Sequence, residues 1–147
     1  MLLVFTVCGY VRADVTPAPL FQDNMVLQQK TGVPVWGRAE PGEKVVITFR
    51  KQVLETMTSQ DGRWRVTLKP LKASAKGEVL TIAGKNTIAL TNVVGGEVWV
   101  CSGQSNMAWP VKQAMNAEED VARAETPGIR SFDVTRIVAA TPRAVCG

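Results

Sequence analysis

A serine with chemical potential follows an apolar run near the middle of the chain. Residues 97–101 read EVWVC, which is typical of a buried strand, and the loop Ser102-Gly103-Gln104-Ser105-Asn106 comes directly after them. In open α/β sheets, ligands bind where a strand gives way to a helix. A serine held there can present its Oγ to a carbonyl carbon while its own N–H faces the developing oxyanion. Ser105 is therefore a candidate nucleophile, and Gly103 is expected to allow close backbone approach and unusual φ/ψ. By spacing alone, the alternative is an ordinary polar turn capped by Ser102 or Ser105.

The chain contains no histidine, which limits the chemistry that Ser105 can perform. Histidine is the usual general base at neutral pH and the commonest metal ligand. A Ser-His pair cannot be completed within these 147 residues. The cysteines Cys8, Cys101 and Cys146 have no metal-ligand spacing, so we predict no metal and no cofactor. Cys101 is expected to be buried and inert, and a Cys101–Cys146 disulfide is left open.

The elements that would position Ser105 form a strand–helix–strand pattern. After the apolar run, Asn116 and Glu119 have capping-box spacing for a helix, which Pro127-Gly128 ends. Residues 129–135 (IRSFDVT) are predicted to be the next strand, which completes a βαβ unit with parallel strands. One such unit cannot bury both faces of its sheet. We therefore expect residues 94–147 to be the incomplete start of an α/β domain.

The preceding residues 14–93 predict an all-β sandwich. Short strand-like runs alternate with turn signals, and no helical pattern interrupts them. Pro41-Gly42 suits a type II turn, Asp61-Gly62 suits a tight hairpin, and Gly84-Lys85-Asn86 marks another turn. The predicted strands are residues 25–28, 33–37, 44–50, 52–58, 63–68, 78–83 and 87–91. In residues 63–68 the alternation places Trp64, Val66 and Leu68 on one face.

Residues 1–13 are predicted to be a signal peptide, because an apolar start precedes a small-residue site ending at Ala13. The alternative is a buried first strand, which Pro17 and Pro19 would interrupt. We expect a secreted or periplasmic protein that does not associate with the membrane after signal cleavage. The net charge is +4, and its basic residues are scattered, so no nucleic-acid site is predicted.

Several segments in order resemble the sialate O-acetylesterases, a family of SGNH-type (GDSL-like) carbohydrate esterases. The run GEVWVCSGQSNMAWP at residues 96–110 resembles their first catalytic block. The run LFQDNMVLQ at residues 20–28 is also similar, as are Pro34-Val35-Trp36-Gly37, the Pro41-Gly42 turn and Asp61-Gly62-Arg63-Trp64. The resemblance extends from about residue 20 to residue 135.

The resemblance implies a flavodoxin-like α/β esterase domain after the sandwich, with Ser105 as nucleophile and its N–H in the oxyanion hole. The implied substrate is an O-acetylated sugar or sialic acid, with Gly103, Gln104, Asn106 and Trp109 as substrate-binding candidates. Gln104 stands where the Gly-Asp-Ser form has an acid, and Ala108 stands where many relatives have Glu. The family's Asp, His and later oxyanion donors match no residue here. We therefore expect an N-terminal fragment that is inactive by itself.

Two other interpretations stay open. The chain could be a non-catalytic carbohydrate-binding β-sandwich, or an esterase of the acetylxylan type. Packing is predicted for Trp36, Trp64 and Trp99, which alternate with polar neighbours, rather than sugar stacking. For Trp109, which follows the serine loop, packing and a place near the acyl pocket are equally favoured.

Overall fold

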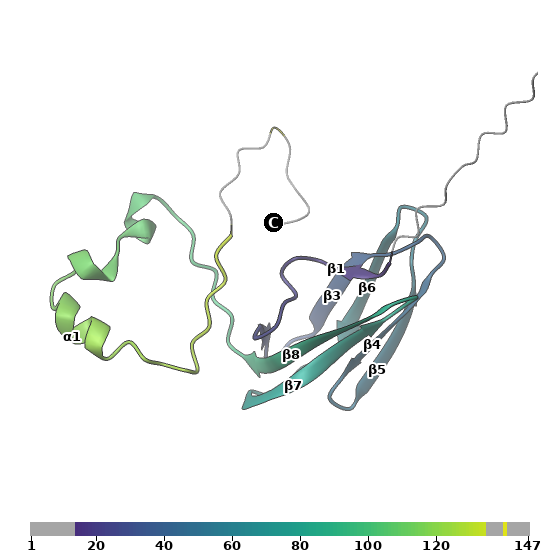
Figure 1. The fold of residues 1–147 in the computed structure, drawn as a ribbon, viewed down its shortest axis with the longest axis horizontal. Helices are drawn as coiled ribbons and strands as arrows, with labels where there is room; N and C mark the ends of the chain where they lie inside the picture. Colours follow the sequence, from purple (N-terminus) through teal and green to yellow (C-terminus); the bar gives the residue numbers. More distant parts are fainter. Residues whose placement is uncertain (1–13, 135–139, 141–147) are drawn as a thin grey trace, which may run out of the picture.

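The computed structural model describes residues 14–134 and residue 140, and its strands form two β-sheets (Figure 1). The predicted signal peptide lies outside the described residues. The strands are β1 (Thr16–Pro17), β2 (Val26–Gln28), β3 (Val33–Arg38), β4 (Lys44–Phe49), β5 (Gln52–Met57), β6 (Arg63–Leu68), β7 (Ser74–Ala83) and β8 (Thr87–Gly96). The mostly-β, two-sheet part of the predicted fold is confirmed.

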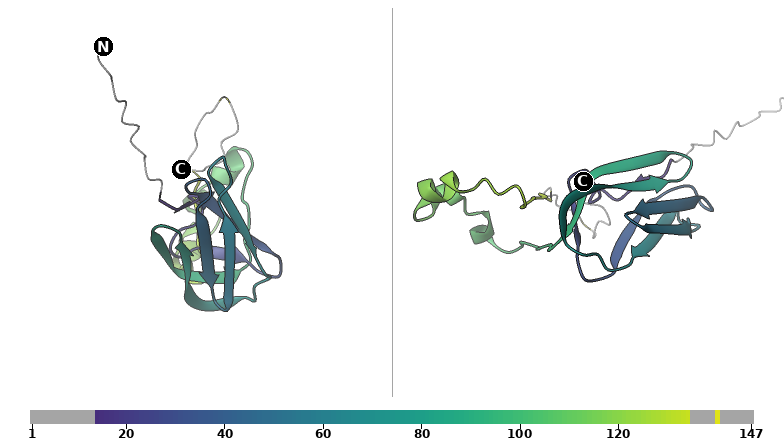
Figure 2. Two further views of the ribbon diagram at one scale, coloured as in Figure 1. Left: turned by 90° about the vertical axis from the view of Figure 1, so that its right-hand side faces the viewer. Right: turned by 90° about the horizontal axis from the view of Figure 1, so that it is seen from below.

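The strands are ordered β1-β3-β6 in one sheet and β2-β8-β7-β4-β5 in the other (Figure 2). Every pairing is antiparallel except that of β2 with β8, which is parallel and places Val26 opposite Val94. Strand β1 was not among the predicted strands. It is two residues long, and it exists because Pro17 pairs with Gly37 of β3.

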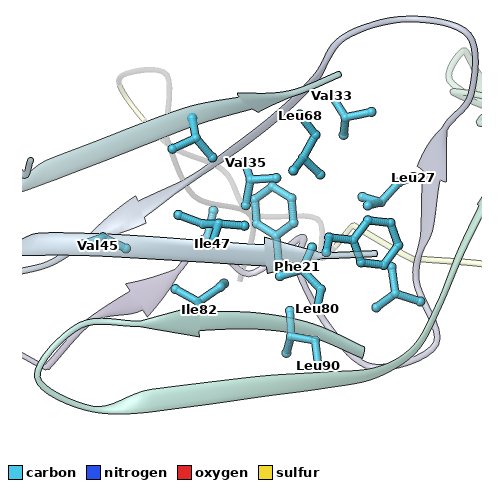
Figure 3. Close-up of a cluster of buried hydrophobic side chains, with 14 of the residues drawn as sticks. Phe21, Leu27, Val33, Val35, Val45, Ile47, Leu68, Leu80, Ile82 and Leu90 are labelled. Atoms are coloured by element: carbon cyan, nitrogen blue, oxygen red, sulfur yellow. The ribbon is translucent and has the colours of Figure 1, made fainter. Parts of the chain in front are cut away.

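The core lies between the two sheets, where side chains from both point toward each other (Figure 3). In β6 the exposed and buried positions alternate strictly, and Trp64, Val66 and Leu68 are buried as predicted. The Trp64 indole N–H donates to the Arg38 carbonyl over 3.1 Å, which satisfies the polar atom of a buried ring. From the opposite sheet, Ile47 of β4 is fully buried.

Two glycine turns adopt the backbone that their sequences require. Gly42 and Gly62 have φ of +77° and +74°, in the left-handed region that favours glycine. For Pro41-Gly42 this agrees with a type II turn. The predicted hairpin at Asp61-Gly62 is wrong, because β5 and β6 belong to different sheets. The turn instead carries the chain from one sheet to the other.

Beyond β8 the described chain forms an extension at one end of the sandwich, residues 97–134, which we call the arm (Figures 1 and 2). The arm contains the 3-10 helices η1 (Ser105–Ala108) and η2 (Val111–Gln113) and the helix α1 (Ala117–Ala122). The predicted helix is thus present. Asn116 precedes it with φ of +63° and no side-chain cap bond, so the predicted capping box does not form.

No strand forms at residues 97–101, or at residues 129–134 of the strand predicted for 129–135, so the described arm contains no βαβ unit. An apolar run becomes a parallel strand only when neighbouring strands take up its backbone hydrogen bonds and other elements cover its faces. The described residues provide neither around 97–101. In the part of the chain that the structure describes, no helix is long and apolar enough to cross a membrane.

Candidate active site

Ser105 is the first residue of η1 and is exposed to solvent. Gln104 precedes it with an extended backbone (φ −88°, ψ −165°), and its carbonyl accepts the Met107 N–H over 2.9 Å. Within residues 14–134, no hydrogen bond is formed to the Ser105 hydroxyl. The structure therefore places Ser105 at a turn into a helical segment, where its side chain is accessible to an ester.

Gly103 lies where the chain turns back on itself. A Cβ at this position would stand 2.7 Å from Cγ of Met107, so a side chain there would force Met107 away. The Met107 side chain therefore lies close against the Gly103 backbone. The predicted unusual φ is not observed, because Gly103 is absent from the residues with positive φ.

The remaining candidate residues lie on the same short segment. Gln104, Asn106 and Trp109 are all exposed, and Trp109 keeps 61% of its surface accessible. The Trp109 N–H donates to the Asn106 carbonyl over 3.2 Å and ends η1. The segment thus presents a hydroxyl, an amide pair and an indole to solvent over one turn.

The four residues predicted to be packed or buried have different outcomes. Trp64 is buried, and Trp36 packs edge-on against Phe21 with ring centroids 4.9 Å apart. Trp99 is 83% exposed and Cys101 is exposed, so the predicted burial of both is wrong in the arm. The cause is the missing sheet around residues 97–101, since nothing in the described chain covers that run.

The first residues of the arm are held by glutamines of the sandwich. The Glu97 carboxylate accepts from Gln28 Nε2 over 3.0 Å and from Gln29 Nε2 over 2.6 Å. The hydrogen bond from Gln28, and to a smaller extent that from Gln29, lowers the pKa of Glu97 below its usual value. The Val98 N–H donates to Gln28 Oε1 over 2.7 Å. Sequence reasoning assigned no role to Glu97, although Gln28 ends one of the family-like runs.

A metal centre has no support in the described residues. No group of three or more Cys, Asp or Glu side chains is placed to hold an ion in residues 14–134.

Comparison with known proteins points to one class of enzyme. No family model matches the chain. In structure it is similar to a carbohydrate acetylesterase from Xanthomonas citri, with a TM-score of 0.84 and 30% identity, covering 90% of this chain and 31% of that one. The two-sheet fold and much of the arm thus resemble part of a carbohydrate acetylesterase.

The curated relatives are more specific. The chain is 33% identical to the sialate O-acetylesterase of Mus musculus, over 82% of this chain and 24% of that protein. It is 32% identical to the sialate O-acetylesterase of Homo sapiens, over 85% of this chain and 25% of that protein. The predicted resemblance is confirmed, and the chain is a relative of the sialate O-acetylesterases that spans about a quarter of their length.

Proposed function

We propose that this chain carries the nucleophile segment of a carbohydrate O-acetylesterase of the sialate O-acetylesterase type. The observation that carries the proposal is the exposed Ser105, at the start of η1 and in a segment similar to known acetylesterases. Residues 1–96 are only 96 of the 147, so a structural likeness over 90% of the chain necessarily extends into the arm. The arm, and not the sandwich alone, therefore supports the proposal.

The proposed reaction is acyl transfer in two steps. Ser105 Oγ attacks the carbonyl carbon of an acetyl ester on a sugar or sialic acid, its proton passes to a base, and the sugar hydroxyl leaves. Water then hydrolyses the acetyl-enzyme and releases acetate. The base must come from outside these residues if it is histidine, because the chain has none.

The neighbours of Ser105 are given supporting roles in this proposal. The Ser105 N–H contributes to an oxyanion hole. Gly103 has no side chain and so leaves space for the Met107 side chain to pack against the loop. Gln104 and Asn106 provide side-chain amides that can hydrogen-bond to the substrate. The accessible face of Trp109 can cover an acetyl or sugar group.

Two wider features belong to the same proposal. Because Val94–Gly96 end β8 of the sandwich, we propose that residues 97–147 belong to an SGNH-type α/β domain, in which added strands would provide the neighbours that residues 97–101 lack. We also propose that the protein is exported and acts on sugars outside the cytoplasm, on the basis of the leader-like residues 1–13.

A chimera tests the catalytic assignment. Residues 14–134 replace the matching part of the Xanthomonas citri acetylesterase, and hydrolysis of p-nitrophenyl acetate is measured. We expect Ser105→Ala to reduce kcat/KM by several powers of ten, as loss of a nucleophile does. Ser102→Ala, which removes another exposed serine of the same loop, is the matched control and should retain activity within a few-fold.

Two results would contradict the catalytic assignment of Ser105 or favour another function. A folded, active chimera that is indifferent to Ser105→Ala would exclude Ser105 as nucleophile. We expect the 147-residue chain itself to show no Ser105-dependent hydrolysis. Binding of glycans by residues 14–96, without any dependence on the arm, would favour the binding-module interpretation instead.

A further inference from the structure

The two ends of the arm meet the same edge of the five-stranded sheet. Its first residues are hydrogen-bonded to the end of β2. Glu97 accepts from Gln28, which ends the strand, and from Gln29, which follows it, and Val98 donates to Gln28. Its last part returns to the residues just before β2, where Arg130 is hydrogen-bonded to the carbonyls of Asn24 and Met25. Residues 121–129 are all exposed, whereas Arg130 is half-buried, so Arg130 marks the point where the chain regains contact with the sandwich.

The Arg130 guanidinium enters a cluster of oxygen acceptors. Nη1 lies 2.9 Å from the Asn24 carbonyl oxygen, 3.3 Å from that of Met25 and 2.6 Å from that of Asn92. Nη2 lies 3.2 Å from the side-chain oxygen of Asn92. Hydrogen bonds from a charged donor are about twice as strong as neutral ones, and a fork of donors also fixes direction.

The acceptors converge because two asparagines have left-handed backbone. Asn24 and Asn92 have φ of +64° and +53°, a region that Asn tolerates better than most residues. Their side chains are joined by a bond from Asn92 Nδ2 to Asn24 Oδ1 of 2.7 Å. Gly77 leaves the room for this pair, since a Cβ there would lie 2.1 Å from Asn92 Oδ1. The parallel pairing of β2 with β8 brings the two asparagines together.

We propose that Arg130 is a positioning residue that fixes the returning end of the arm on the Asn24–Asn92 pair, so that the Ser105 segment is held at both ends. The importance of this for ester hydrolysis rests on the proposed function; the anchoring itself does not. A segment tied at one end samples a wide range of positions, and a second tie removes most of that freedom. The catalytic proposal assigns no role to the run at residues 20–28. In the anchoring proposal, this run forms the surface of the sandwich to which both ends of the arm are hydrogen-bonded.

Pulsed electron spin resonance tests the anchoring in the full chain, without any ester. Cys8, Cys101 and Cys146 are changed to Ser, and spin labels are placed at Val53→Cys on β5 and Met115→Cys near the tip of the arm. Both sites are well exposed, at 64% and 88%. In this doubly labelled chain, which is the parent for the variants below, we expect one narrow distribution of the distance between the two labels. After Arg130→Gln we expect a broad distribution. Arg130→Lys, which keeps a charged donor, should restore much of the narrow peak.

The controls separate anchoring from charge and from folding. Arg123→Gln removes an equal charge from the arm and should leave the distribution narrow, because Arg123 forms an ion pair with Glu119 of the arm itself. Glu97→Gln loosens the opposite end and should broaden the distribution as well. The far-ultraviolet circular dichroism of each variant should match the parent. An equally narrow distribution in Arg130→Gln, or a broad one in the parent, would overturn the proposal. Neither result would bear on Ser105, which the chimera tests separately.

Discussion

Asp23 belongs to the same family-like run as Asn24, and its carboxylate has a structural task. One of its oxygens accepts the Thr91 N–H over 2.5 Å and the Thr91 hydroxyl over 2.9 Å. The hydrogen bond from the Thr91 N–H has the larger effect and that from the Thr91 hydroxyl the smaller one, and both lower the pKa of Asp23 below its usual value. A lowered pKa in the folded state means that the ionised form stabilises the fold. This contribution is present above the unfolded pKa, about 3.9, and is lost as the pH falls through the lower folded value.

This pKa shift leads to a prediction about acid stability. Asp23→Asn should be less stable than the parent at neutral pH, because an amide is a weaker acceptor than a carboxylate. Its urea midpoint should then fall less than that of the parent between about pH 5 and pH 2. Asp120→Asn, on the exposed helix α1, is the control for a change of charge. Parallel pH curves for Asp23→Asn and the parent would contradict this role.

At the scale of elements, β3 depends on a glycine that allows two strands to approach it. A Cβ on Gly37 would lie 2.0 Å from the Thr16 carbonyl oxygen and 2.6 Å from Cζ2 of Trp64. Gly37 faces Pro17 of β1 on one side and Trp64 of β6 on the other. The absent side chain is therefore what allows β1 to pair with β3 while the indole stays buried.

We predict that Gly37→Ala destabilises the fold by about 1–3 kcal/mol, the usual cost of overpacking. The backbone oxygen cannot move aside as a flexible side-chain end could. Equilibrium unfolding in urea measures the change. Gly128→Ala is the matched control, because nothing lies within 4 Å of its Cβ position. Equal midpoints for the two variants would show that β1 can shift without cost.

At the scale of the whole molecule, the apolar core and the arm are separate. The core cluster runs from Val15 to Val93, and no hydrophobic residue of the arm is buried. The arm instead exposes many large apolar side chains, including Trp99, Val100 and Met115. These exposed apolar side chains are the ones that the proposed larger α/β domain would cover.

We predict that a chain ending at Gly96 keeps the β-sheet circular dichroism and a free energy of unfolding within about 2 kcal/mol of the full chain. Among the described residues, it loses the hydrogen bonds that Glu97, Val98 and Arg130 form with the sandwich. It should also bind less of a hydrophobic dye than the full chain does. A chain ending at Asn86, which lacks β8, should not fold. Loss of cooperative unfolding in the chain ending at Gly96 would mean that the arm contributes to the core.

The sequence predicted local features well and neighbour-dependent features poorly. Residues 63–68 form a strand with the predicted buried face, because alternation is a property of the strand itself. Pro41-Gly42 forms the predicted turn for the same local reason. By contrast, β1 was missed and residues 97–101 were predicted to be a strand that is not there. Both depend on which strand lies alongside, and residue spacing does not contain that information.

The sequence alone determined that Ser105 follows an apolar run, that no histidine accompanies it, and that the chain resembles sialate O-acetylesterases. These statements depend on residue order and type only. The tertiary structure decided that β2 lies beside β8, and that Glu97 and Arg130 bind along that edge. There Glu97 is hydrogen-bonded to Gln28, 69 positions earlier, and Arg130 to Asn24, 106 positions earlier. Such contacts form only when the whole sandwich closes around its core, so no local pattern announces them.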